Sequence, residues 1–193
     1  SMSLEPCVPQ NLGKKGELPE IHIDYPTKKC YNLCAYYQKG KNNMGRIIAI
    51  ANQKGGVGKT TTAINLSASL AALGKKVLVI DTDPQGNTTS GFGVDKNELE
   101  NTIYELILGE CSIQDCMIKN VVEGVSILPS NVNLAAAEIE LIGVDRKDFI
   151  LKNEIDYIRD SYDFILIDCP PSLNTLTINA MTAANSVLVP IQC

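Results

Sequence analysis

The chain has 193 residues, of which 45% are hydrophobic and 20% charged, so it is long and apolar enough to bury a globular core. A formal net charge of −5 speaks against a broadly basic surface for nucleic acid. The sequence has no apolar run of the roughly 18 residues that a membrane span needs, and residues 1–20 have no apolar stretch typical of a signal peptide. We therefore expect a cytoplasmic protein.

The seven cysteines are odd in number and irregularly spaced in a chain that is not small. This pattern does not suit a disulfide framework, so we expect reduced thiols, as in a cytosolic protein. Cys169 is expected to be a small packing residue, because no histidine near it could activate its thiol as a nucleophile.

The composition changes near residue 44. Pro6, Pro9, Pro19 and Pro26 precede that point, and no helical or strand period persists there. We expect residues 1–43 to form an irregular N-terminal extension, either non-native or partly disordered. Residues 44–193 then form the one folded domain.

Predicted strands and helices alternate along this domain. A buried strand over 46–51 precedes a helix over 59–73 and a second strand over 76–81. A short helix over 101–108, a turn capped at Ser112, a strand over 125–128 and helices over 133–141 and 147–159 follow. A strand over 164–168, a helix over 173–183 and a strand over 186–190 complete the pattern.

Continuous apolar strands separated by helices are typical of a parallel sheet that is covered on both faces. The sequence therefore predicts an α/β fold with a doubly wound, mostly parallel sheet. Because the chain stops directly after a predicted strand, we expect that a C-terminal part of the domain is missing.

A glycine-rich loop lies between the first strand and the first helix, as a phosphate-binding loop requires. Its amides and the helix N-terminus would bind phosphate, Lys59 would reach the β- and γ-phosphates, and the Thr60 hydroxyl would bind Mg²⁺. Gln53 stands where this loop usually opens with a glycine. The predicted nucleotide-binding residues are Lys54, Gly55, Gly56, Val57, Gly58, Lys59, Thr60 and Thr61.

Aspartates follow two of the predicted strands, at Asp81, Asp83 and Asp168. Carboxylates at the carboxyl ends of parallel strands lie beside the ligand crevice of such folds. Asp168 fits an acid that holds Mg²⁺ through water. A plain turn over 81–87 and a carboxylate that caps the next helix are the alternative interpretations.

The segments KGGVGKTT, DTDPQGN and DCPPS resemble the ParA/Soj family of DNA-partitioning ATPases, which are P-loop NTPases with a deviant Walker A motif. The resemblance covers about residues 44–193. It implies that Lys54 contacts nucleotide across an ATP-sandwiched dimer, that Asp83 positions the attacking water, and that Asp81 supports the Mg²⁺ shell. The implied catalytic residues are Asp83, Lys54 and Lys59, and the implied metal-site residues are Thr60, Asp81 and Asp168.

The same resemblance implies an ATP-dependent dimerisation switch that uses ATP and Mg²⁺ to drive chromosome or plasmid partitioning. Hydrolysis would be slow and stimulated by a ParB-like partner protein. Non-specific DNA, rather than a membrane, would be bound, and the protein would be nucleoid-associated. Contacts to adenine and DNA are expected beyond Cys193. A MinD-like membrane-associated division-site ATPase and a nucleotide-dependent binding module without useful turnover remain the alternatives.

Overall fold

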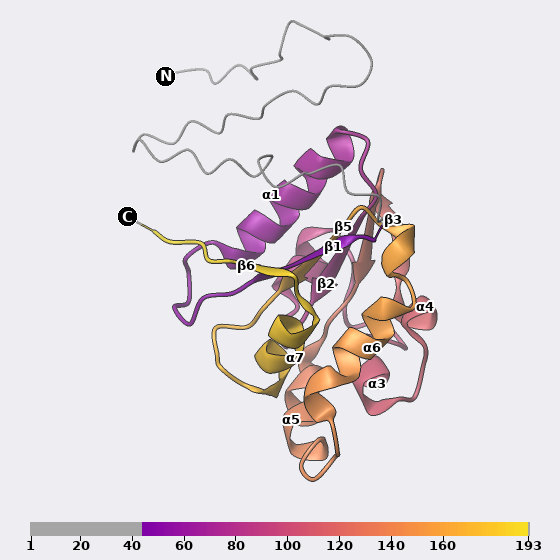
Figure 1. Ribbon diagram of the computed structural model, residues 1–193, viewed down its shortest axis with the longest axis vertical. Coiled ribbons are helices and arrows are strands. Elements are labelled where there is room, and N and C mark those ends of the chain that lie inside the picture. The colour runs from indigo at the N-terminus through magenta and orange to yellow at the C-terminus, as the bar shows by residue number, and fades with distance from the viewer. Residues whose placement is uncertain (1–43, 193) are drawn as a thin grey trace, which may run out of the picture. The chain divides into compact units, whose positions relative to one another are not determined.

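The computed structural model of the protein describes residues 44–192 (Figure 1). The predicted irregular extension, residues 1–43, lies outside the described residues, so its conformation stays a prediction. The described residues form an α/β fold around one sheet.

Six strands form this sheet in the order β3-β4-β2-β5-β1-β6. All neighbouring strands are parallel except the β3–β4 pair, which is antiparallel. The predicted mostly parallel sheet is therefore confirmed. The strands are β1 (Arg46–Ile50), β2 (Val77–Asp81), β3 (Ile118–Val122), β4 (Val125–Leu128), β5 (Phe164–Asp168) and β6 (Ser186–Leu188).

The helices of the described residues connect these strands. Several of them are short, and three segments are 3₁₀ turns rather than α-helices. The α-helices are α1 (Lys59–Ala72), α2 (Asn87–Gly91), α3 (Ile103–Leu108), α4 (Ile113–Cys116), α5 (Ala137–Glu140), α6 (Ile150–Asp156) and α7 (Thr175–Ala183). The 3₁₀ turns are η2 (Val132–Ala136), η3 (Lys147–Phe149) and η4 (Arg159–Ser161).

Both faces of the sheet are covered by helices. Successive side chains of a strand point to opposite faces, so one strand contributes to two buried clusters. In β1, Ile47 and Ala49 belong to one buried cluster, which also holds residues of α3, α6 and α7. Ile48 and Ile50 belong to a second cluster, which α1 closes with Ala63 and Leu70. In Figure 1, α1 accordingly lies apart from α3, α6 and α7 across the strands.

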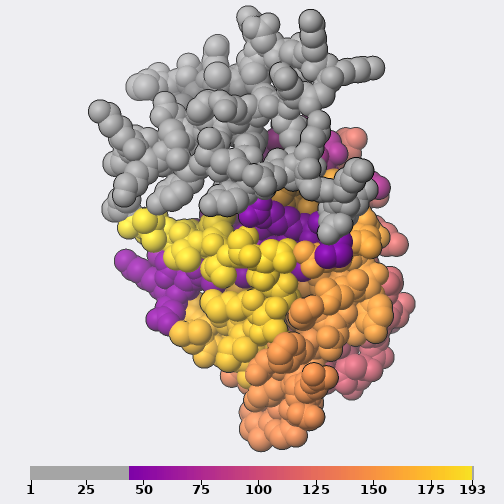
Figure 2. Space-filling view, viewed as in Figure 1, coloured from indigo at the N-terminus to yellow at the C-terminus, as the bar shows by residue number. Residues whose placement is uncertain are grey.

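The surface near the end of the described chain is formed by α7 and β6, drawn in yellow next to the orange α6 segment in Figure 2. α7 packs against both α6 and η3. Among the described strands β6 lies at the edge of the sheet. Val187 on it and Val189 beyond it are half exposed, and Ile191 is mostly exposed. This edge is thus more apolar than a solvated sheet edge usually is.

The structure differs from the predicted elements in its short segments. The helix predicted over 133–141 is split into η2 and α5, because the side chain of Asn131 accepts a hydrogen bond from the Asn133 N–H and starts a 3₁₀ turn. The helix predicted over 147–159 is likewise broken into η3, α6 and η4. Neither α2 nor β3 was predicted, since each has only 5 residues and no sustained period.

The thiol chemistry of Cys111 and Cys116 also differs from expectation. The predicted cap at Ser112 is confirmed: its side chain accepts a hydrogen bond from the Asp115 N–H and starts α4. That turn brings the two cysteines together, and the structure pairs them as a disulfide. The expectation of reduced thiols is therefore wrong for this pair, whereas Cys169 is a free, buried cysteine.

Candidate nucleotide-binding site

The glycine-rich loop joins β1 to α1 at the carboxyl end of the parallel strands. Lys54, Gly55 and Gly56 are exposed on it. Gly58 precedes α1 with a left-handed φ of 90°, and its position provides no side-chain cap to the helix. A Cβ at Gly58 would meet none of the described residues within 4 Å, so the space over the first amides of α1 is open. The loop therefore offers free N–H groups and a helix N-terminus to an anion.

Lys59 is the first residue of α1 and is only 8% exposed. Its ammonium group donates a hydrogen bond to the Lys54 carbonyl oxygen over 3.4 Å, which folds the side chain back along the loop. The loop is anchored at its start by Asn52, whose side chain accepts from the Lys54 N–H and donates to the Pro190 carbonyl. A positive charge is thus held against the loop.

Asp168 ends β5 and is 1% exposed. Its Oδ2 atom accepts hydrogen bonds from the Thr60 hydroxyl at 2.8 Å and the Thr88 hydroxyl at 2.6 Å. Its Oδ1 atom is buried and has no hydrogen-bond partner among the described residues. Burial raises the pKa of Asp168, although the two threonine hydroxyls favour its ionised form.

The residues present fit a Mg²⁺ ion at this place. A buried, unpartnered carboxylate oxygen costs free energy, so it calls for a ligand that the protein itself does not supply. Mg²⁺ prefers oxygen ligands and usually uses one or two carboxylates together with phosphate oxygens. Thr60 and Asp168, hydrogen-bonded to each other beside the phosphate loop, provide a hydroxyl and a carboxylate of that kind.

Asp81 ends β2 directly beside Asp168, its register partner on β5, and is fully buried. Its Oδ2 atom accepts from the N–H and the hydroxyl of Thr89, each at 2.8 Å. Its Oδ1 atom accepts from the Asp83 N–H at 3.1 Å. Burial raises the pKa of Asp81 to about 7, and the neighbouring Asp168 carboxylate adds to the rise.

Asp83 is half buried and lies in the turn between β2 and α2. Its Oδ1 atom accepts a hydrogen bond from the Gln85 N–H at 2.9 Å. The negative charge of Asp83 helps to raise the pKa of Asp168, after the larger effect of burial. Asp83 therefore follows the same end of the sheet at which Asp168 lies.

The segment after β5 runs from Cys169 to Ser172. Cys169 is 1% exposed, and burial raises the pKa of its thiol to about 12. Cys169 belongs to the buried apolar cluster on the α7 side of the sheet, which confirms that it is a packing residue. The Ser172 carbonyl oxygen accepts a 2.6 Å hydrogen bond from the Thr177 hydroxyl, which ties the segment to α7.

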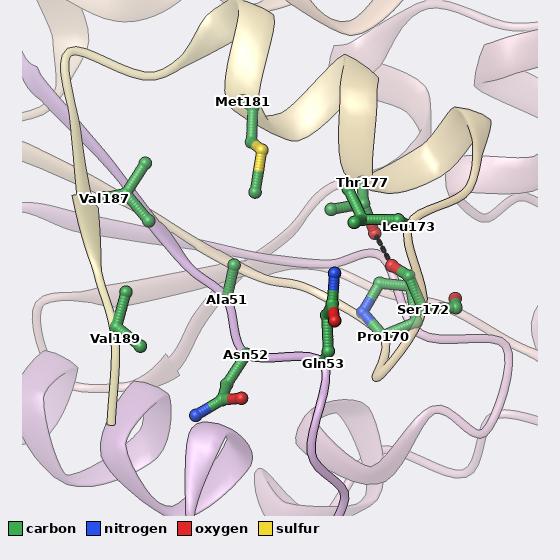
Figure 3. A pocket seen from close by; sticks show the side chains of 10 residues that line it. All are labelled: Ala51, Asn52, Gln53, Pro170, Ser172, Leu173, Thr177, Met181, Val187 and Val189. Atoms are coloured by element: carbon green, nitrogen blue, oxygen red, sulfur yellow. Dashed lines mark hydrogen bonds between the residues drawn. The ribbon is translucent and has the colours of Figure 1, made fainter. Parts of the chain in front are cut away.

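A hollow of about 280 Å³ lies between this segment, α7 and β6 (Figure 3). Its lining is mostly apolar and does not include Lys59, Asp83 or Asp168. Figure 3 shows Met181 and Thr177 on α7, Val187 on β6 and Gln53 on the loop after β1 around this hollow. The residues that line it are Ala51, Asn52, Gln53, Pro170, Ser172, Leu173, Thr177, Met181, Val187 and Val189.

Most of the predicted site residues meet at one end of the sheet. Lys59 and Thr60 lie beside Asp168, which is the register partner of Asp81. Thr61 is exposed on α1. Sequence reasoning missed the side chains that hold these residues in place: Asn52, Thr88, Thr89 and Ser130.

Two features of the sequence could have indicated Thr88, Thr89 and Ser130. Thr88 and Thr89 directly follow the DPQGN segment and are hydroxyl residues in a stretch that the pattern left unassigned. Ser130 follows a predicted strand, which places it near the ligand edge of a parallel sheet.

Comparison with known proteins places these features among nucleotide-binding relatives. A family model described as "AAA domain" matches residues 45–193. The sporulation initiation inhibitor protein Soj of Bacillus subtilis is 49% identical over 150 residues, which are 78% of this chain and 59% of Soj. The chromosome partitioning protein ParA of Caulobacter vibrioides is also 49% identical over 150 residues, 77% of this chain and 56% of that protein.

Solved structures agree with this grouping. Cobyrinic acid a,c-diamide synthase from Mycobacterium smegmatis, with a bound ATP analogue and magnesium, is 41% identical with a TM-score of 0.75, over 77% of this chain and 61% of that one. A putative plasmid partition protein from Borrelia burgdorferi, bound to AMPPNP, is 35% identical with a TM-score of 0.70, over 76% and 62%. The predicted pairing of ATP and Mg²⁺ with this fold is thereby confirmed.

The chain spans 59% and 56% of the lengths of the Soj and ParA relatives. The described part of the chain contains no helix with both the length and the apolar character that crossing a membrane requires.

Proposed function

Because this chain belongs to the ParA/Soj family of P-loop ATPases, we propose that its protein is an ATPase switch for DNA partitioning. The observation that carries the proposal is the Thr60–Asp168 hydrogen bond beside a buried carboxylate oxygen that no described residue pairs. Phosphoryl transfer needs backbone amides and a lysine that bind phosphate, and a carboxylate that can bind Mg²⁺. All three lie at one edge of the sheet.

Nucleotide binding is assigned to the loop of residues 54–61. The loop amides and the α1 N-terminus receive the phosphate oxygens, while Lys59 supplies positive charge to the β- and γ-phosphates. Thr60 and Asp168 would hold Mg²⁺, which would supply positive charge to the phosphate oxygens. Both carboxylate oxygens of Asp81 already accept hydrogen bonds, from Thr89 and from the Asp83 N–H. We therefore propose that Asp81 supports the metal site indirectly rather than as a direct ligand.

Asp83 is proposed to act on the attacking water. Its half-buried carboxylate lies in a turn that hydrogen bonds hold, so it can orient a water molecule toward the γ-phosphorus and accept its proton. Attack of that water forms the new P–O bond, the bond to the bridging oxygen breaks, and ADP and phosphate leave. We propose that this hydrolysis is slow and is stimulated by a partner protein.

Lys54 is proposed to act across a dimer of two such chains. Its side chain is exposed on the open face of the loop, and its backbone is fixed by Asn52. An exposed ammonium group on the nucleotide side is suited to contact phosphate held by a second copy. ATP would thus join two protomers, and hydrolysis would separate them.

The partners and location are proposed from the relatives. Soj and ParA are named for sporulation and chromosome partitioning, and the Borrelia protein for plasmid partition. We propose a ParB-like partner, non-specific DNA and a nucleoid-associated, cytoplasmic location for the whole protein. The Mycobacterium smegmatis synthase suggests another reaction, but it is 41% identical, against 49% for Soj and ParA.

Single-turnover and steady-state phosphate release in the full-length protein would test this function. Lys59→Ala should abolish nucleotide binding, because the charge beside the loop is lost. Asp83→Ala should keep binding of ATP and Mg²⁺ but lower turnover by about a hundredfold or more, the usual scale for a positioned proton acceptor. Wild-type phosphate release from the Asp83→Ala protein would overturn the role given to Asp83.

A further inference from the structure

The turn that bears Asp83 is held by a closed ring of hydrogen bonds. Asp81 accepts from the Asp83 N–H through Oδ1 and from Thr89 through Oδ2. The Thr89 hydroxyl in turn accepts from the Ser130 N–H at 2.9 Å. The Ser130 hydroxyl closes the ring by donating to the Asp83 carbonyl oxygen at 2.8 Å. We call Asp81, Thr89 and Ser130 the brace.

The brace holds Asp83 by both polar groups of its backbone. The N–H is bonded to Asp81, and the carbonyl oxygen accepts from Ser130 and from the Gly86 N–H. All three brace residues are fully buried, whereas Asp83 itself is half buried. A buried, satisfied network is rigid, so it fixes the direction in which the Asp83 side chain leaves the turn.

The members of the brace come from separate parts of the fold. Asp81 ends β2, Thr89 lies in α2, and Ser130 follows β4, the strand that pairs with β2. Close packing reinforces the ring: a Cβ on Gly86 would lie 2.8 Å from the Ser130 carbonyl oxygen. The turn is therefore pressed against the segment after β4 as well as bonded to it.

We propose that Thr89 and Ser130 are positioning residues that set the catalytic geometry of Asp83 without touching the nucleotide. This inference rests on the proposed ATPase function. A water-orienting carboxylate must be held close to its productive position, and small displacements reduce the rate without weakening substrate binding. Ser130 and Thr89 should accordingly control turnover rather than affinity.

Ser130→Ala in the full-length protein is the most direct test. It removes the bond to the Asp83 carbonyl oxygen and leaves the Ser130 N–H in place. We expect turnover to fall about tenfold, the effect of losing an interaction of roughly 1.4 kcal/mol. Affinity for ADP with Mg²⁺, measured by calorimetry, should change by less than about twofold, since a positioning residue affects the transition state alone.

Ser67→Ala is the matched control. Ser67 is also fully buried, and its hydroxyl also donates to a backbone carbonyl oxygen at 2.8 Å, that of Ile64 within α1. It should leave turnover unchanged. Hydrogen exchange in residues 83–86 should become faster in Ser130→Ala and stay as in the wild type in Ser67→Ala, because only the former releases the turn.

Thr89 supplies a second pair of variants. Thr89→Val keeps the shape but loses the hydroxyl, so it should lower turnover, and Thr89→Ser should restore it. In an Asp83→Ala background, Ser130→Ala should cause no further loss, because its effect passes through Asp83.

The outcomes distinguish the positioning role of Ser130 from the proposed role of Asp83. Normal turnover in Ser130→Ala, or an equal further loss in the Asp83→Ala background, would overturn the positioning role. If Asp83→Ala itself turns over normally, the proposed function of Asp83 fails, and the positioning role fails with it. If Asp83→Ala is inactive and Ser130→Ala is normal, only the positioning role is lost.

Discussion

At the scale of single residues, the site is built around two aspartates that sit side by side. Asp81 and Asp168 are register partners on neighbouring strands and are both buried. Hydroxyl groups of threonine, namely those of Thr60, Thr88 and Thr89, donate hydrogen bonds to them. Neutral donors hold the carboxylates in place while leaving negative charge for a cation to neutralise.

The pKa of Asp81 predicts how stability depends on pH in the absence of nucleotide. Burial raises this pKa from 3.8 to about 7, so between these values the folded state keeps a proton that the unfolded chain releases. The folded state then binds more protons, and the free energy of unfolding contributed by Asp81 falls as pH rises through this window.

Urea denaturation of the nucleotide-free protein and of Asp81→Asn, at several pH values from about 4 to about 7, checks this prediction. The wild type should lose stability relative to Asp81→Asn as pH rises, because the variant cannot ionise there. A difference between the two proteins that is constant or grows with pH would contradict the assignment.

At the scale of elements, α2 shows how a short helix can be placed by its surroundings. It has 5 residues and begins after Gly86, which has a left-handed φ of 59°. An isolated helix of this length would not form in water, so its hydrogen bonds to the buried aspartates and to Ser130 hold it. This dependence on distant partners is the reason that the sequence pattern did not predict it.

Gly86 is the position at which α2 is most sensitive to substitution. Gly86→Ala forces a Cβ into the left-handed region and against the Ser130 carbonyl oxygen. Gly93→Ala is a matched control, because Gly93 has a φ of 78° but a Cβ there would meet none of the described residues within 4 Å. The control should lose about 1–2 kcal/mol of unfolding free energy, the cost of the left-handed conformation alone.

Gly86→Ala should lose clearly more than Gly93→Ala and should also lower turnover, because Ser130 and the Asp83 turn must move apart. Chemical denaturation and phosphate release on the two variants measure both effects. Equal losses of stability with unchanged turnover would show that the close approach at Gly86 has no role.

At the scale of the whole molecule, the parallel sheet gathers residues from distant parts of the sequence. The carboxyl ends of β1, β2 and β5 carry the phosphate loop, Asp81 and Asp168, because parallel strands end at the same edge. The charge of this chain, −5, does not by itself provide the basic surface that DNA requires. DNA binding by the whole protein therefore stays a proposal that rests on the relatives.

Co-sedimentation of the full-length protein with DNA and with anionic liposomes separates partitioning from a membrane-based role. With ATP and Mg²⁺ the protein should sediment with DNA and should be released as salt rises, because phosphate contacts are salt-dependent. Lys59→Ala, which should not bind nucleotide, serves as the control and should remain in the supernatant. Nucleotide-dependent binding to liposomes alone would instead favour a MinD-like division-site ATPase.

Local sequence patterns determined those strands, helix ends and loops whose conformation depends on residues adjacent in the chain. The strands over 125–128 and 164–168 have the predicted bounds, and the Lys59 start of α1 follows from the glycines before it. Apolar runs and glycine positions act through the immediate backbone, so sequence alone predicts them. The loop of residues 54–61 was recognisable for the same reason.

Only the tertiary structure determined which side chains contact each other across the sheet. The bonds from Thr88 to Asp168 and from Ser130 to Asp83 join residues 80 and 47 positions apart. Such contacts depend on strand order and register, which side-chain periodicity does not specify. The placement of α2 likewise follows from packing, because the free energy that fixes it comes from partners brought close by the fold.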